Sequence, residues 1–172
     1  MTVAQPDLYD AFAEEAATYG VELTRVDVST GAVRETLAEV IEQPAVGAPL
    51  PWEEVSLPAS VTTEPTPAEL TEATTGVTAA SFAVAEYGSV ILAATPDGSE
   101  PASLFPDLHV FVLDAADIVP DMRATFERLG DQFRADRSSA ILATGPSATA
   151  DMGALVQGAH GPERVHGVVI DR

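Results

Sequence analysis

The sequence predicts an α/β fold with a mainly parallel sheet flanked by helices. Two observations predict it. Strand and helix patterns alternate along the chain, and two strand candidates are apolar on both faces, which is typical of parallel strands covered on both sides. These candidates are residues 89–94 (SVILAA) and 108–113 (LHVFVL). Because 172 residues is the usual length of one domain, we expect residues 1–172 to form a single unit.

The N-terminal part predicts a helix, a strand and a second helix. Apolar residues recur at helical spacing from Leu8 to Tyr19. Residues 21–28 then alternate apolar and polar side chains, as a strand does. Thr30 is a candidate cap for the next helix, whose apolar face begins at Val33.

A proline-rich segment, residues 44–66, interrupts this pattern and contains the only tryptophan. A structureless loop of this length is uncommon in a compact domain, so we expect a short buried strand around Val61. The segment is not an interdomain linker, because residues 1–43 are too few to form a stable domain alone.

The remaining elements follow from local signals. Thr66 and Glu69 form a capping box, with Pro67 at the first helical position. Residues 78–86 predict a further short helix, and Pro120 opens a helix whose apolar face includes Met122, Phe126, Leu129 and Phe133. The last three predicted elements are a strand at 139–143, a helix at 147–157 and a strand at 165–170.

Composition excludes several kinds of chemistry. The chain has 27 acidic and 8 basic residues, for a formal charge of −19, and it has no cysteine. All the basic residues are arginine. The missing cysteine excludes a thiolate nucleophile and Cys-ligated zinc or iron–sulfur clusters. The missing lysine excludes a Schiff base and a P-loop lysine, and the net charge disfavours nucleic acid and anionic membranes as partners.

The acidic, lysine-free composition predicts a halophile's protein, and the alternative is a mesophilic acidic protein that has few lysines by chance. Apolar residues make up 46% of the chain, which argues for a folded core with an acidic coat rather than for disorder. Molar salt shortens the electrostatic screening length to about 3 Å, and so limits the repulsion between the acidic side chains of such a coat. The first ten residues show no secretory signal and no apolar run is long enough for a transmembrane helix, so we expect a cytoplasmic protein.

Three glycine-containing junctions are candidate ligand sites, since ligands of open α/β sheets bind beyond strand ends. They are residues 74–78 with 85–89, residues 145–151, and residues 158–162. Their glycines, Gly76, Gly88, Gly145 and Gly161, are most simply explained by positive φ or by close approach of the backbone.

The junction at Gly145 suits an anion if a helix begins there. The free N–H groups and positive dipole end would face the ligand, and Ser147 and Thr149 could donate hydroxyl hydrogens. In the alternative interpretation, Ser147 only caps the helix and Asp151 complements its dipole. The two roles can coexist.

Glu86 and His160 are the candidate catalytic groups. Glu86 precedes a buried strand and could be a nucleophile or general base, or could simply accept backbone N–H bonds at the turn. His160 lies in a tight turn between Gly158 and Gly161, ahead of the last strand, and could serve acid–base chemistry or be a turn residue without chemistry. The three histidines lack clustered partners, so no metal site is expected. The chain also lacks dinucleotide-binding and nucleophile-elbow motifs.

Three blocks of the sequence together resemble a known family. They are TTGVTAASFAVAEYGSVIL, FPDLHVFVLDAADIVP and ILATGPSATADMGALVQGAHGPERVHGVVID, which span residues 74–171. In order and spacing they resemble the LUD domain, in its lactate-utilisation protein C branch. The resemblance implies a fold like that of sugar-phosphate isomerases and CoA transferases. It also implies a role in oxidising L-lactate to pyruvate beside iron–sulfur partner proteins, with no cofactor in this chain itself.

The resemblance also marks motif positions: Thr78, Glu86, Gly88, Ser89, Gly145, Pro146, Ser147, Thr149, Asp151, His160, Gly161 and Pro162. The chain departs from the family at Ala148, where relatives often have Arg or Lys, and at Tyr87, where they often have Thr. Arg164 is the candidate replacement cation for a small carboxylate or phosphate-bearing ligand at the Gly145 turn.

Three functions remain open from the sequence. The first is an accessory subunit of lactate oxidation, and the second is a free-standing CoA-transferase-like or isomerase-like enzyme. The second requires Glu86 and His160 to face one cleft. The third is a small-molecule-binding regulator, and a homo-oligomer is compatible with each.

Overall fold

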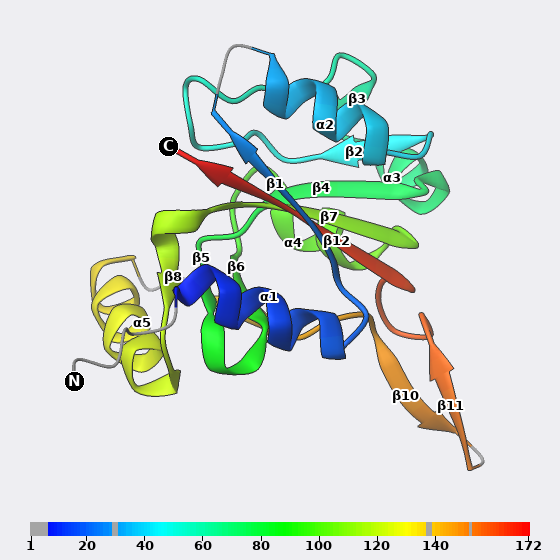
Figure 1. Ribbon diagram of the computed structural model, residues 1–172. Helices are drawn as coiled ribbons and strands as arrows, with labels where there is room; N and C mark the ends of the chain where they lie inside the picture. Colours follow the sequence, from blue (N-terminus) through cyan, green and yellow to red (C-terminus); the bar gives the residue numbers. More distant parts are fainter. Residues whose placement is uncertain (1–6, 29–30, 137–138, 152) are drawn as a thin grey trace, which may run out of the picture.

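The largest element of the fold is a six-stranded sheet in which every neighbouring pair of strands is parallel (Figure 1). The computed structural model describes residues 7–28, 31–136, 139–151 and 153–172. The predicted α/β fold with a mainly parallel sheet is confirmed. In spatial order the strands are β1 (Glu22–Asp27), β12 (Arg164–Asp171), β7 (Leu108–Asp114), β4 (Thr75–Ala79), β2 (Ala45–Gly47) and β3 (Val61–Thr63).

A second, four-stranded sheet packs on one face of the first. Its order is β8 (Ile118–Val119), β5 (Phe82–Val84), β6 (Ser89–Ala93) and β9 (Ala140–Ala143). The predicted strand at 89–94 is present as β6, but it is antiparallel to both neighbours. It is apolar on both faces because Val90 and Leu92 face the first sheet while Ile91 faces outward. A strand that is apolar on both faces is therefore covered on both sides, but this pattern does not say whether the strand is parallel or antiparallel to its neighbours.

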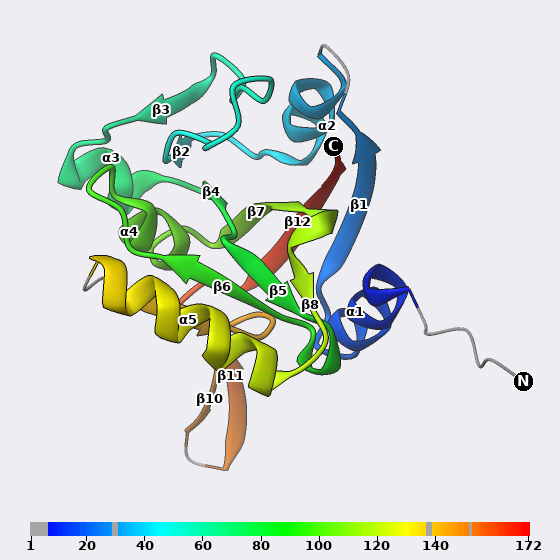
Figure 2. The ribbon, with the colours of Figure 1, turned by 90° about the vertical axis from the view of Figure 1, so that its left-hand side faces the viewer.

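Helices cover the outer faces of both sheets, which gives a layered molecule (Figures 1 and 2). Val33 and Leu37 of α2 (Ala32–Val40) pack on the six-stranded sheet on the side away from the second sheet. Met122 and Leu129 of α5 (Met122–Asp136) cover the outer face of the second sheet. The remaining helices are α1 (Leu8–Thr18), α3 (Pro67–Glu72) and α4 (Ser99–Leu104).

The main core lies between the two sheets. Phe111 and Val169 of the first sheet meet Val90 and Leu92 of the second, and Phe12 of α1 closes one end. All five side chains are buried. Burying each such side chain contributes about 1.5–3 kcal/mol to the free energy of unfolding, so the core between the two sheets is a principal source of stability.

Several local predictions are confirmed. The first helix, the strand around Val61 and the last strand are present, and α3 begins with the predicted capping box. Thr66 Oγ1 accepts a hydrogen bond from the Glu69 N–H, and the Glu69 carboxylate accepts one from the Thr66 N–H. The predicted cap of the second helix, Thr30, lies outside the described residues.

Two predicted helices are wrong. Residues 78–86 continue β4, turn into β5 and end in a short 3-10 turn, η1 (Ala85–Tyr87). Residues 147–157 form an antiparallel hairpin of β10 (Ala148–Asp151) and β11 (Ala154–Gln157), which projects from the body in Figure 1. Gly153, with φ +85°, allows the tight turn that a helix could not contain.

A close approach of backbone explains Gly76. A Cβ atom there would overlap the carbonyl oxygen of Ala102 in α4. The absent side chain lets α4 lie directly on β4, which brings Ser103 and Leu104 toward the space between the two sheets. Of the helices in the described parts of the chain, none has both the length and the apolar character needed to cross a bilayer.

Candidate functional site

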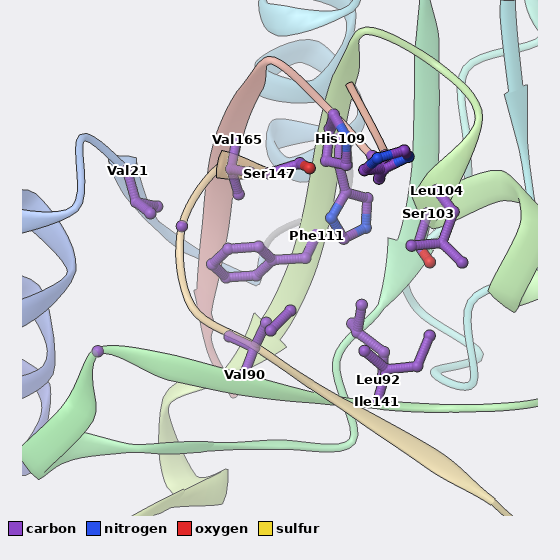
Figure 3. Close-up of a pocket in the computed structure, with 16 residues that line it drawn as sticks. Val21, Val90, Leu92, Ser103, Leu104, His109, Phe111, Ile141, Ser147 and Val165 are labelled. Carbon is purple, nitrogen blue, oxygen red and sulfur yellow. The ribbon is translucent and has the colours of Figure 1, made fainter. Parts of the chain in front are cut away.

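A cavity of about 140 Å³ lies between the two sheets, at the amino-terminal ends of β7 and β12 (Figure 3). His109 and Phe111 enter it from β7, with Val90 and Leu92 from β6 on the opposite side. On each strand the two lining residues are separated by one residue, because every second side chain of a strand points to the same face. The other lining residues are Val21, Gly88, Ser103, Leu104, Ile141, Ala143, Gly145, Ser147, His160, Gly161, Pro162 and Val165.

His109 is the polar centre of this cavity. Its imidazole is buried, and its Nε2 shares a 2.9 Å hydrogen bond with the hydroxyl of Thr78. Burial lowers the pKa of His109 to about 4, because the charged imidazolium would lose its hydration, so the ring is neutral near pH 7.

The second ring nitrogen of His109 opens into the cavity. Among the described residues, every fully buried side-chain nitrogen or oxygen has a hydrogen-bond partner. His109 Nδ1 has no hydrogen bond to a described residue, so this atom is not fully buried. Nδ1 therefore faces the cavity that His109 lines. A neutral imidazole has one donor nitrogen and one acceptor nitrogen. If Nε2 accepts a hydrogen bond from the Thr78 hydroxyl, Nδ1 is a donor, and if Nε2 donates to that hydroxyl, Nδ1 is an acceptor.

The three sequence blocks meet around the cavity. The N–H of Ser147 donates to the carbonyl of Pro162 at 2.9 Å, and the N–H of Gly158 donates to the carbonyl of Ser147 at 3.0 Å. These bonds lie within the third block and join its two glycine-containing junctions, 145–151 and 158–162, at the base of the β10–β11 hairpin. The hydroxyl of Ser89 lies 2.6 Å from that of Thr144, which joins the first block to the third.

The expected anion site at Gly145 is not built as predicted, because a hairpin and not a helix follows it. The positive dipole end and free N–H groups of a helix are therefore missing from this turn. Gly145 and Ser147 do line the cavity, and Gly145 has φ +64°. Thr149 and Asp151 lie on β10, and Thr149 is not among the residues that line the cavity.

Arg164 does not reach the Gly145 turn. Its guanidinium donates two hydrogen bonds, of 2.6 and 2.8 Å, to the carboxylate of Glu42, and lowers the pKa of Glu42. The pair lines a separate surface hollow together with Glu22 and His166. The interpretation of Arg164 as the missing cation of the anion site is therefore not supported.

Glu86 and His160 do not share the cavity. Glu86 lies in η1 with an exposed side chain, and its backbone N–H donates to the carbonyl of Pro120. His160 lines the cavity while remaining exposed, at the end of the hairpin. The sequence-based requirement for an enzyme that uses both groups in one cleft is not met.

The predicted site residues thus divide into three sets. The cavity brings together Gly88, Gly145, Ser147, His160 and Gly161. Thr78 and Ser89 lie behind this lining as buried residues that hydrogen-bond to His109 and Thr144. Glu86, Thr149 and Arg164 lie elsewhere, and the side chain of Asp151 lies outside the described part of the chain.

The structure adds residues that the sequence reasoning passed over, above all His109. His109 stands in the apolar run 108–113, where the strand pattern alone gives it no functional role. The available signal was a titratable side chain in a strand that is otherwise apolar, since such a group needs a buried partner. Within the described residues, no cluster of three His, Asp or Glu could hold a metal ion.

Comparisons with known proteins agree with this architecture. The family model of the LUD domain matches residues 13–170. "Lactate utilization protein C" of Deinococcus radiodurans is 31% identical, over 98% of this chain and 82% of the relative. The protein of the same name from Macrococcus caseolyticus is 27% identical, over 85% of this chain and 71% of the relative.

A solved structure has the same fold. The crystal structure of a DUF162 family protein from Deinococcus radiodurans superposes with a TM-score of 0.74. The match covers 98% of this chain and 99% of the other, at 21% sequence identity. It supports the arrangement of the two sheets on which the cavity depends.

Proposed function

Because the chain belongs to the LUD domain family, we propose that it is an accessory subunit of L-lactate oxidation to pyruvate, working beside iron–sulfur partner proteins. The observation that carries the proposal is the agreement of two results. Relatives over most of the chain are named for lactate utilization, and the family's sequence blocks converge on one cavity.

The composition supports an accessory role rather than a redox role. L-Lactate oxidation removes two electrons, and the chain has no cysteine to hold an iron–sulfur cluster. Electron transfer in this proposal therefore belongs to the partner proteins. This chain contributes the cavity, in which His109 and Ser147 offer hydrogen bonds to a small ligand.

The cavity also favours ligand binding over the Glu86-based enzyme. A nucleophile or general base must come within hydrogen-bond reach of the reacting atom. Glu86 is exposed and does not line the cavity, whereas His109 is held by Thr78 at its wall. A ligand-binding regulator is the second candidate, because the same cavity would serve it.

Deletion of the gene in its own host tests the proposal. We expect the deletion strain to lose growth on L-lactate and to keep growth on pyruvate, with growth restored by the wild-type gene. Affinity purification of the tagged chain in about 1 M KCl, which screens its acidic coat, should recover proteins with an iron–sulfur absorbance. Unchanged growth on L-lactate would reject the accessory role and leave the regulator.

A further inference from the structure

None of the described residues that line the cavity has a permanently charged side chain. Among the residues that the structure describes, its lining includes no Arg, Asp or Glu. The polar groups are the hydroxyls of Ser103 and Ser147 and the imidazoles of His109 and His160. Ser103 already donates its hydroxyl hydrogen to the carbonyl of Glu100, which leaves its oxygen as an acceptor.

Most of the arginines that the structure describes pair with carboxylates, and none of those described lines the cavity. Six of the eight form ion pairs with carboxylates: Arg25, Arg123, Arg128, Arg134, Arg164 and Arg172. The whole chain carries a formal net charge of −19, which disfavours the approach of an anion. A carboxylate or phosphate in the cavity would lose its hydration without gaining a cation.

We propose that this cavity binds an uncharged small ligand, or the uncharged end of a larger one: a short alkyl group beside a carbonyl or hydroxyl that hydrogen-bonds to His109 Nδ1. The inference rests on the proposed function, because it takes the same cavity as the functional site and narrows its ligand class. Free L-lactate and pyruvate are anions, so they are not ligands of this cavity.

The size and the walls of the cavity suit such a ligand. An engineered apolar cavity of about 150 Å³ holds a molecule of benzene, which has six heavy atoms. The present cavity is close to that size, at about 140 Å³. Phe111, Leu92 and Ile141 would contact the alkyl part, while His109 Nδ1 can donate to a carbonyl or accept from a hydroxyl, according to its tautomer (Figure 3).

Matched pairs of probes that differ only in charge test the proposal. We would titrate L-lactamide against L-lactate, and pyruvamide against pyruvate, and follow the methyl NMR signals of Leu92 and Ile141. Each amide should bind at least about tenfold more tightly than its anion, because an unpaired buried charge costs more than one hydrogen bond. Equal affinity within a pair, tighter binding of the anion, or no response to either amide would overturn the proposal.

Variants locate the binding. His109→Phe removes Nδ1 and should weaken amide binding roughly tenfold or more. His166→Gln, in the separate hollow, is the matched histidine control and should leave amide affinity unchanged. Ile141→Trp enlarges a side chain of the cavity wall on β9, a different strand from those of Thr78 and His109, and should abolish binding. Binding that survives Ile141→Trp would place the ligand elsewhere and overturn the assignment.

The outcomes also separate this inference from the proposed function. If the amides bind while the deletion strain still grows on L-lactate, the accessory role is rejected and the ligand class stands. If no amide binds while the deletion strain fails on L-lactate, the ligand class is rejected and the accessory role stands.

Discussion

The hydroxyl oxygen of Thr78 lies 2.9 Å from Nε2 of His109, and both side chains are buried. Thr78 stands on β4 and His109 on the neighbouring β7, so the sheet itself sets their distance. The bond fixes one nitrogen of the imidazole and directs the other to the cavity. It is the polar contact on which the candidate site depends.

Acid should destabilise the protein through His109. Its folded-state pKa, about 4, lies below the ordinary value of 6.5, so the unfolded chain binds more protons between these values. The stabilisation is complete above pH 6.5 and is lost as the pH falls toward 4. Between pH 7.5 and 5 the free energy of unfolding should fall by about 2 kcal/mol from this residue.

Urea titrations at the two pH values measure this loss. His109→Gln should show a smaller fall than the wild type, because its side chain does not titrate. His166→Gln, which changes a half-buried histidine outside the cavity, should retain the contribution of His109. An identical fall in the wild type and His109→Gln would contradict the assignment.

Removing the Thr78 hydroxyl should destabilise the protein more than shortening its side chain. Thr78→Val keeps the shape but leaves the His109 Nε2 without its partner, at a cost of about 1–3 kcal/mol. Thr78→Ser keeps the hydroxyl and loses one methyl group. Denaturant unfolding should therefore rank Thr78→Ser as more stable than Thr78→Val, and the reverse order would show that the hydrogen bond does not stabilise the fold.

Two glycine-to-alanine variants should have opposite effects. At Gly76 the new methyl group would overlap the carbonyl oxygen of Ala102, so α4 must move and the protein should lose stability. At Gly130, within α5, the nearest atom to a new Cβ is 3.4 Å away, on the flexible side chain of Arg134. Alanine there should raise the free energy of unfolding by about 0.5–1 kcal/mol. Thermal unfolding should therefore show a lower melting temperature for Gly76→Ala than for Gly130→Ala. Equal melting temperatures for the two variants would contradict this prediction.

Salt should stabilise the protein, as we propose for a halophile's acidic coat. Raising KCl from about 0.1 to 1 M shortens the screening length from about 10 to 3 Å and weakens the repulsion within a chain of charge −19. We expect the melting temperature to rise by more than about 4 °C, or roughly 1 kcal/mol or more for a chain of this size. The same rise should occur in NaCl, and a melting temperature independent of salt would argue for an ordinary acidic protein.

Local signals in the sequence predicted local structure well. The capping box of Thr66 and Glu69 needs only four neighbouring residues, and it starts α3 as expected. The hairpin of β10 and β11 was missed although its turn is also local, because small residues such as Ala148 and Ala150 fit a helix as readily as a strand. Only the turn at Gly153 decides between them.

Contacts between distant residues account for the rest. β6 is antiparallel both to β5, which directly precedes it, and to β9, some fifty residues later, and its own apolar pattern encodes neither partner. The pairing of Arg164 with Glu42 joins residues 122 apart and removes the expected cation from the Gly145 turn. The bond between Thr78 and His109 likewise depends on which strands become neighbours. The sequence therefore indicated the motif blocks but not the imidazole of His109, which lies between them in the cavity.

Growth of the deletion strain on L-lactate, when it carries single variants of the gene, tests most directly whether the cavity around His109 is the functional site. Glu86→Gln, an exposed change outside the cavity, should restore growth to the wild-type rate. His109→Phe and the cavity-filling Ile141→Trp should fail to restore it, at soluble protein levels equal to those of the wild type. Restoration by both cavity variants, together with failure of Glu86→Gln, would contradict the account.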